Sequence, residues 1–220
     1  MKTLKSSLTS FSMPSPEVRA EADRRRREAD EAERGRLIAE RVKASGIPER
    51  FRVADISTCP GAVGEWVEAV RSGEYANLAI QGKVGRGKTY SACAALIALA
   101  PDRRVLFSKF SNIIDEIHAT YSGRGTEEDV KARYANAPVL CIDELGKCVP
   151  RENTINTLFD IIDDRSARML PTAFTSQYQG KELVERLSFD GDQEYAKAIL
   201  SRLAENAFRV EVIGEDRRRS

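Results

Sequence analysis

The stretch Gly82-Lys83-Val84-Gly85-Arg86-Gly87-Lys88-Thr89 fits the phosphate-binding pattern G-x-x-x-x-G-K-[ST], the P-loop. An apolar run at 77–81 precedes it and reads as a strand, and residues 90–99 after it read as a buried helix. Strand, glycine loop and helix in this order are the context that the pattern requires. The glycines let backbone N–H groups turn inward around phosphate oxygens, and the helix N-terminus adds partial positive charge. An ordinary glycine turn before a helix is the alternative, which the agreement of pattern and context disfavours.

Two carboxylates end a second apolar run, Val139-Leu140-Cys141-Ile142-Asp143-Glu144. Such a run is typical of a buried parallel strand, and carboxylates at its end would face the phosphate crevice. We expect Lys88 to reach the β and γ phosphates and the Thr89 hydroxyl to ligate Mg²⁺. Asp143 would hold the Mg²⁺ water shell, and Glu144 would polarise the attacking water. The two motifs together predict nucleotide binding.

Composition and charge limit the class of protein. The 220 residues suffice for one sizeable domain with an appendage, and a net charge of +1 means that any nucleic-acid site must be a local patch. The four cysteines lack the paired spacing of metal ligands and there is one histidine, so we expect no zinc site. No apolar run approaches about 18 residues, and the N-terminus lacks the apolar stretch of a signal peptide. These features predict a reduced, cytoplasmic protein without membrane contact.

The first 45 residues differ from the rest in composition. Residues 1–16 are rich in Ser, Thr and Pro and are predicted to be a disordered tail. Residues 17–45 read as a charged helix, in which Glu21 and Arg25 have the i,i+4 spacing of a stabilising pair. Two interpretations stay open for it, a solvated helix or a docking helix for a partner protein.

Residues 46–220 alternate between apolar runs and helical patterns. The apolar runs that read as strands lie at 77–81, 105–107, 139–144, 171–177 and 208–213. This alternation predicts an α/β fold with a five-stranded, mainly parallel sheet. Right-handed crossovers would bring the P-loop and the ends of the third and fourth strands together. Gln177, at the polar end of the fourth strand, could then orient water or sense the γ-phosphate.

Two further segments have two interpretations each. Residues 47–51, Ile-Pro-Glu-Arg-Phe, either form a linker with a proline turn or flank the adenine ring. The helix pair expected between the second and third strands carries basic residues that form either a solvated face or a phosphate-binding patch. Charge alone does not decide between these. The residues are Lys109, Arg124, Lys131 and Arg133.

Taken together, these segments resemble the AAA+ ATPases of the DnaC/IstB type, which are bacterial and phage helicase loaders and transposition helper proteins. The resemblance covers roughly residues 45–218 and rests on segments that match in order. These are Ser45 to Phe51, the P-loop, Leu140 to Gly146, Leu158 to Arg165, Pro171 to Gln177, Ser201-Arg202-Leu203 and Gly214 to Arg218. The last two segments are weak singly, and the ordered set is specific.

The resemblance implies a P-loop AAA+ core in which ATP is bound between self-associating subunits. Arg202 would be the arginine finger that reaches a neighbour's γ-phosphate, and Arg218 would contact the nucleotide of its own subunit. The catalytic set would be Glu144, Lys88, Arg202 and Gln177. The nucleotide contacts would be Gly82, Gly85, Arg86, Gly87, Lys88, Thr89, Tyr90 and Arg218, and the metal ligands Thr89 and Asp143. Gln177 stands where the family usually has Asn, and the end of the chain soon after the last strand predicts a core without a C-terminal lid domain.

The resemblance also implies partners and a function. Family members dock on a partner through the N-terminal segment and engage single-stranded DNA through the helix pair, here the region of Lys109, Arg124, Lys131 and Arg133. The leading interpretation is therefore an ATP-hydrolysing DNA replication protein that loads the hexameric replicative helicase onto single-stranded DNA. The alternative is an IstB-like ATPase that helps a transposase and assembles on duplex DNA. A non-hydrolysing adaptor is disfavoured by the Asp143-Glu144 pair, and a small-molecule kinase does not explain the Ser-Arg-Leu203 helix.

Overall fold

The structure is a computed structural model that describes residues 15–213. The predictions for residues 1–14 and for Arg218 lie outside the described residues. Contacts divide the chain into two units, one up to Leu37 and one from Ile38 onward. The second unit contains the sheet and the described site residues.

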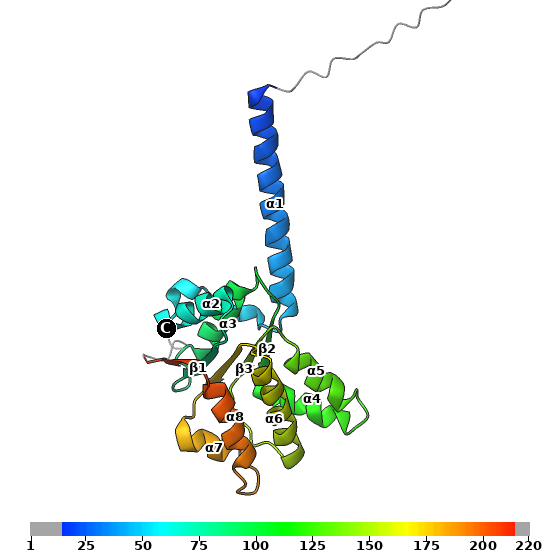
Figure 1. Ribbon diagram of the computed structural model, residues 1–220, viewed down its shortest axis with the longest axis vertical. Coiled ribbons are helices and arrows are strands. Elements are labelled where there is room, and N and C mark those ends of the chain that lie inside the picture. The colour runs from blue at the N-terminus through cyan, green and yellow to red at the C-terminus, as the bar shows by residue number, and fades with distance from the viewer. Residues whose placement is uncertain (1–14, 214–220) are drawn as a thin grey trace, which may run out of the picture. The chain divides into compact units, whose positions relative to one another are not determined.

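Five strands form one sheet in the second unit (Figure 1). The order of the strands across the sheet is β2-β3-β4-β1-β5, and every neighbouring pair is parallel. The prediction of a five-stranded sheet is thereby confirmed. Because the strands run the same way, their carboxyl ends share one edge, and the loops after β1, β3 and β4 meet there. The strands are β1 Asn77–Gln81, β2 Val105–Lys109, β3 Val139–Asp143, β4 Thr172–Ser176 and β5 Ala207–Glu211.

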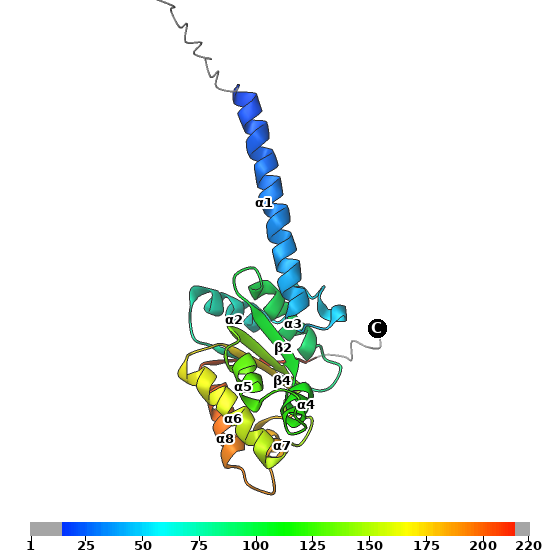
Figure 2. The same cartoon turned by 90° about the vertical axis from the view of Figure 1, so that its right-hand side faces the viewer.

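Helices cover both faces of this sheet (Figure 2). Helices α2 and α3 pack on one face, and α4 to α8 pack on the other. Each face of the sheet thus has its own hydrophobic core, and successive side chains of a strand alternate between the two. In β1, Leu78 and Ile80 belong to the core on the side of α2 and α3, and Ala79 between them belongs to the core on the side of α4 to α8. Strands buried on both faces read as continuous apolar runs, which is why the α/β prediction succeeded. The helices are α2 Gly61–Ser72, α3 Lys88–Leu99, α4 Phe110–Thr120, α5 Glu127–Ala135, α6 Glu152–Ala167, α7 Gly180–Leu187 and α8 Glu194–Ala204.

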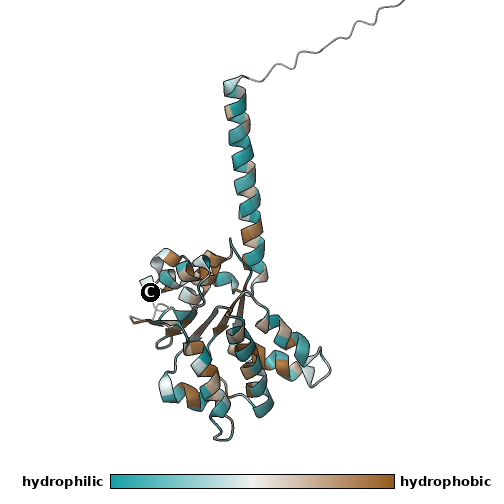
Figure 3. Ribbon diagram, viewed as in Figure 1, coloured by the Kyte–Doolittle hydropathy of each residue, from teal (hydrophilic) through white to brown (hydrophobic). Residues whose placement is uncertain are grey.

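The predicted charged helix is present as α1, Pro16–Ala44. Its described side chains are exposed up to Leu37, and Figure 3 shows this part of the helix as predominantly hydrophilic. Arg25 forms the expected ion pair with Glu21, a type of pair that stabilises a helix by a few tenths of a kcal/mol. None of the described helices combines the length and apolar composition needed to cross a bilayer.

The last turns of α1 belong to the second unit. Val42 is buried in the core that α2 and α3 share with the sheet, and Ile38 packs against that core. Arg41 donates hydrogen bonds of 3.0 Å to the carbonyl oxygens of Ala100 and Pro101. The contacts therefore place the boundary between the two units after Leu37, whereas the sequence placed it after residue 45.

Candidate active site

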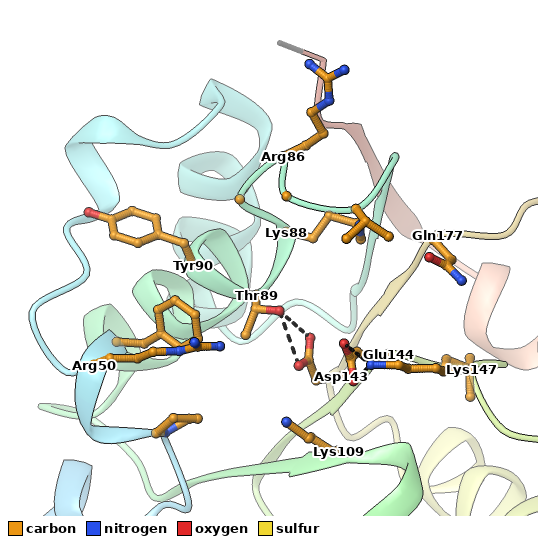
Figure 4. A pocket seen from close by; sticks show the side chains of 16 residues that line it. Arg50, Arg86, Lys88, Thr89, Tyr90, Lys109, Asp143, Glu144, Lys147 and Gln177 are labelled. Carbon is orange, nitrogen blue, oxygen red and sulfur yellow. Dashed lines mark hydrogen bonds and ion pairs between the residues drawn. The ribbon is translucent and has the colours of Figure 1, made fainter. Parts of the chain in front are cut away.

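A cavity of about 730 Å³ opens at the carboxyl edge of the sheet (Figure 4). Its size suits a small-molecule ligand. The segment 47–51 forms part of its wall through Pro48, Arg50 and Phe51, so it is more than a linker. The cavity brings together nine of the predicted site residues, Gly85, Arg86, Gly87, Lys88, Thr89, Tyr90, Asp143, Glu144 and Gln177.

The P-loop backbone adopts conformations that favour glycine. Gly85 and Gly87 have φ values of 81° and 93°, in the left-handed region, and they lead the chain to Lys88 at the start of α3. Gly82 has a different reason to be glycine, because a Cβ there would lie 2.6 Å from the carbonyl oxygen of Val212. Gly82 does not line the cavity. The close approach of the chain after β5 accounts for this glycine, and its contact with the nucleotide stays a prediction.

Positive charge dominates the cavity wall. Lys88 donates a 2.8 Å hydrogen bond from Nζ to the carbonyl oxygen of Lys83 and so lies over its own loop. The N-terminus of α3 adds partial positive charge at the same place. Five cationic side chains and two carboxylates line the cavity, a balance that suits a phosphate chain. The cations are Arg50, Arg86, Lys88, Lys109 and Lys147, and the carboxylates are Asp143 and Glu144.

Asp143, at the end of β3, is buried and bonded to two hydroxyl groups. Its Oδ1 accepts hydrogen bonds from Thr89 at 2.9 Å and from Thr175 at 2.6 Å. Burial raises the pKa of the Asp143 carboxyl, and the two hydroxyl groups act in the opposite direction. A hydroxyl and a carboxylate are hard oxygen ligands that fit Mg²⁺. No group of three or more His, Cys, Asp or Glu side chains that could hold a metal occurs among residues 15–213, so phosphate and water oxygens would complete the shell.

Glu144 follows Asp143 in a left-handed conformation, with φ of 59°. Its N–H donates to Oγ1 of Thr175 at 3.0 Å, and its carboxylate pairs with Lys147. Thr175, on β4, thus contacts both acidic residues. Thr175 and Lys147 are not among the site residues predicted from the sequence. Thr175 lies in the polar end of the fourth predicted strand. Because parallel strands end at the same edge of a sheet, this position could have indicated that Thr175 lies near the carboxylates.

We expect the substitution Thr175→Val to weaken Mg²⁺-dependent nucleotide binding about tenfold. A lost hydrogen bond to a charged group costs about 1.5–3 kcal/mol, and the pKa of Asp143 should rise further without this hydroxyl. Titration of Mg²⁺ against a fluorescent ATP analogue measures the effect, with Thr175→Ser as the control that keeps the hydroxyl. Equal affinity in the valine and serine variants would show that Thr175 does not position Asp143.

Tyr90 and Arg50 form the cavity wall on the side of the segment 47–51. The Tyr90 hydroxyl accepts a hydrogen bond from the Asp55 N–H at 3.0 Å and lies 3.1 Å from Oγ1 of Thr58. Tyr90 therefore holds the segment after residue 51 against α3. The Arg50 guanidinium lies 4.5 Å from the centre of the Phe51 ring.

Two predicted catalytic residues lie at and beyond the rim. Gln177 is exposed at the rim of the cavity. Arg202, on α8, does not line the cavity of its own chain. It pairs with Asp163 and lies 4.9 Å from the centre of the Phe159 ring, both on α6. The roles of Gln177 and Arg202 stay predictions.

The four basic residues of the predicted DNA-binding region have different surroundings. Lys109 lines the cavity, at the end of β2. Lys131 pairs with Glu127 at 3.2 Å and Asp160 at 2.6 Å, and Arg133 pairs with Glu116 at 3.0 Å. Carboxylates therefore neutralise two of the four charges, and Arg124 is exposed in the loop between α4 and α5.

Comparison with known proteins gives consistent matches. A family model described as IstB-like ATP binding protein matches residues 28–220. A putative insertion sequence ATP-binding protein of Sinorhizobium fredii is 32% identical over 158 residues, which are 71% of this chain and 60% of that protein. The crystal structure of DnaI matches with a TM-score of 0.66 and 22% identity, over 78% of this chain and 94% of that one. The crystal structure of the DnaC helicase loader matches with a TM-score of 0.62 and 19% identity, over 76% and 100%. These two structures support the P-loop AAA+ fold.

Proposed function

Because the chain belongs to the family of IstB-like ATP-binding proteins, we propose that it is a Mg²⁺-dependent ATPase that loads a replicative DNA helicase onto single-stranded DNA. One observation supports the ATPase activity above all others. The Thr89 hydroxyl lies 2.9 Å from the buried Asp143 carboxylate, in one cavity with Lys88 and Glu144. Phosphoryl transfer to water depends mainly on this kind of positioning and on electrostatic stabilisation.

Each residue has one task in this proposal. Lys88 and the P-loop N–H groups bind phosphate oxygens. Thr89 and Asp143 hold Mg²⁺, which when bound neutralises charge on the phosphates. Glu144 polarises the attacking water and accepts its proton. Gln177, at the rim, orients this water or senses the γ-phosphate.

We propose that Arg202 completes the active site of a neighbouring subunit. It does not line the cavity of its own chain, and its side chain is about one-third exposed on α8 (32%). An arginine supplied from a second chain would stabilise negative charge on the transferred phosphate. ATP turnover would then require self-association with ATP at the subunit interfaces.

Two partners are compatible with this ATPase core. The part of α1 up to Leu37 is an exposed charged helix, which suits docking to another protein, and the fold is similar to that of the DnaC helicase loader. These observations favour the replicative helicase. The 32% identity to a putative insertion sequence ATP-binding protein favours the second candidate, an ATPase that helps a transposase and assembles on duplex DNA.

We expect the full chain, with ATP and single-stranded DNA present, to capture the replicative helicase. A chain that begins at Ile38 should lose most of this capture, because it lacks the exposed part of α1 but keeps the whole second unit. Co-purification with tagged helicase measures both. Unchanged ATP binding by the shortened chain is the control that its fold is intact.

The same assay separates the two candidates. Absence of capture, together with ATP-dependent assembly on duplex DNA, would replace the helicase with a transposase as the partner. Capture that is equal for both chains would keep the helicase as partner and remove the docking role of α1.

A further inference from the structure

Lys147, three residues after Glu144, forms an ion pair with the Glu144 carboxylate. Nζ of Lys147 lies 2.8 Å from each carboxylate oxygen, so one ammonium group engages both oxygens. The N–H of Lys147 donates to the Glu144 carbonyl oxygen at 3.0 Å, which closes a turn. Both side chains line the cavity, and in Figure 4 Lys147 approaches Glu144 from the side away from Asp143.

The backbone of this turn is fixed against its neighbours. Gly146 has φ of 82°, and a Cβ at this position would lie 2.7 Å from Cδ1 of Leu183 on α7. Leu145 is buried, and its N–H donates to the Thr175 carbonyl oxygen at 2.8 Å. The Lys147 side chain, by contrast, is 60% exposed. It can leave Glu144 by rotation about its own bonds, without movement of the backbone.

We propose that Lys147 is a positioning residue that restrains Glu144 and thereby lowers the basal rate of ATP hydrolysis. This inference rests on the proposed ATPase function. To polarise water, Glu144 must offer an oxygen lone pair to that water, and the ion pair with Lys147 favours the state in which both oxygens face the ammonium. Exposed ion pairs are weak and are screened by salt, so the restraint is small and depends on ionic strength.

The test uses the full chain with three substitutions. Lys147→Gln removes the charge and should raise kcat for ATP about two- to fivefold at low salt, the range of an exposed ion pair, with KM unchanged. Lys147→Arg keeps a cation and should stay close to the wild-type rate. Lys181→Gln removes the charge of an exposed lysine on α7 and is the matched control, with no expected change.

The dependence of kcat on salt concentration is a second measurement, and it would not change if Lys147 had only a structural role. Added potassium chloride should raise kcat of the wild-type chain at saturating ATP towards that of Lys147→Gln, and should leave the variant nearly unchanged. Turnover in Lys147→Gln that is equal to or below wild type, with hydrolysis still dependent on Lys88, would overturn the restraint and leave the ATPase function intact. If neither the wild-type chain nor any Lys147 variant turns over ATP faster than Lys88→Ala, the proposed ATPase function is wrong. The proposed restraint of Glu144 by Lys147 is then wrong as well.

Discussion

The substitution Glu144→Gln is expected to preserve ATP binding and to lower ATP turnover by a factor of about 10² to 10⁴, the usual contribution of a general base. Glutamine has the same shape as glutamate, so the N–H bond to Thr175 and the turn that ends at Lys147 can persist. The amide cannot accept a proton from the attacking water. Binding of a fluorescent ATP analogue and steady-state phosphate release, measured on the same preparation, separate the two effects.

Two further variants complete this experiment. Lys88→Ala should lose tight ATP binding, since it removes the cation at the start of α3. Glu152→Gln, which changes an exposed carboxylate in the first turn of α6, should behave as wild type. Turnover at the wild-type rate in Glu144→Gln would remove Glu144 as the catalytic carboxylate. Wild-type affinity for ATP in Lys88→Ala would refute the P-loop assignment itself.

Sequence reasoning predicted the sheet and its edge because the relevant signals are local. Apolar runs mark strands that are buried on both faces, and the glycine pattern marks the loop that follows β1. Since parallel strands end at one edge, the prediction that Asp143, Glu144 and Lys88 lie near one another needed no knowledge of the strand order. The structure places all three in one cavity.

The features that sequence reasoning missed depend on contacts between distant segments. Thr175 forms a hydrogen bond with Asp143 only because β4 lies beside β3. The spacing of residues in the sequence does not show that these two strands are neighbours. The unit boundary after Leu37 depends on the burial of Val42 in the core. The ion pair between Lys131 and Asp160 has the same kind of cause, since it is set by the packing of α5 on α6.

Arg165 is a buried cation that links the segments before β3 and β4 through hydrogen bonds. It lies on α6, is 1% exposed, and donates hydrogen bonds of 2.6 to 3.3 Å to four carbonyl oxygens and one hydroxyl. These acceptors belong to the end of α5 and to the residues that lead into β3 and β4. They are the carbonyl oxygens of Tyr134, Ala135, Ala137 and Pro171, and Oγ1 of Thr172. Burial lowers the pKa of the Arg165 guanidinium to about 9, so the group stays charged at neutral pH.

We expect Arg165→Met to lower the free energy of unfolding by about 3–5 kcal/mol, because it leaves several buried acceptors without a donor. Arg165→Lys should also be strongly destabilising, since an ammonium cannot reach acceptors spread around a planar guanidinium. Urea denaturation followed by circular dichroism measures both. Arg151→Met, an exposed arginine just before α6, is the matched control and should change stability by less than about 0.5 kcal/mol.

The consequence should extend to the active site, because Arg165 joins the start of β4 to the segment before β3. Towards their carboxyl ends these two strands carry Thr175 and Asp143. A shift of one strand against the other would lengthen the 2.6 Å bond between these two side chains. At a temperature where it is still folded, Arg165→Lys should therefore lose Mg²⁺-dependent nucleotide affinity in the same direction as Thr175→Val. Loss of stability without this loss of affinity would confine Arg165 to a role in folding. A variant within about 1 kcal/mol of wild type would show that the bonds to Arg165 contribute no more than ordinary surface bonds.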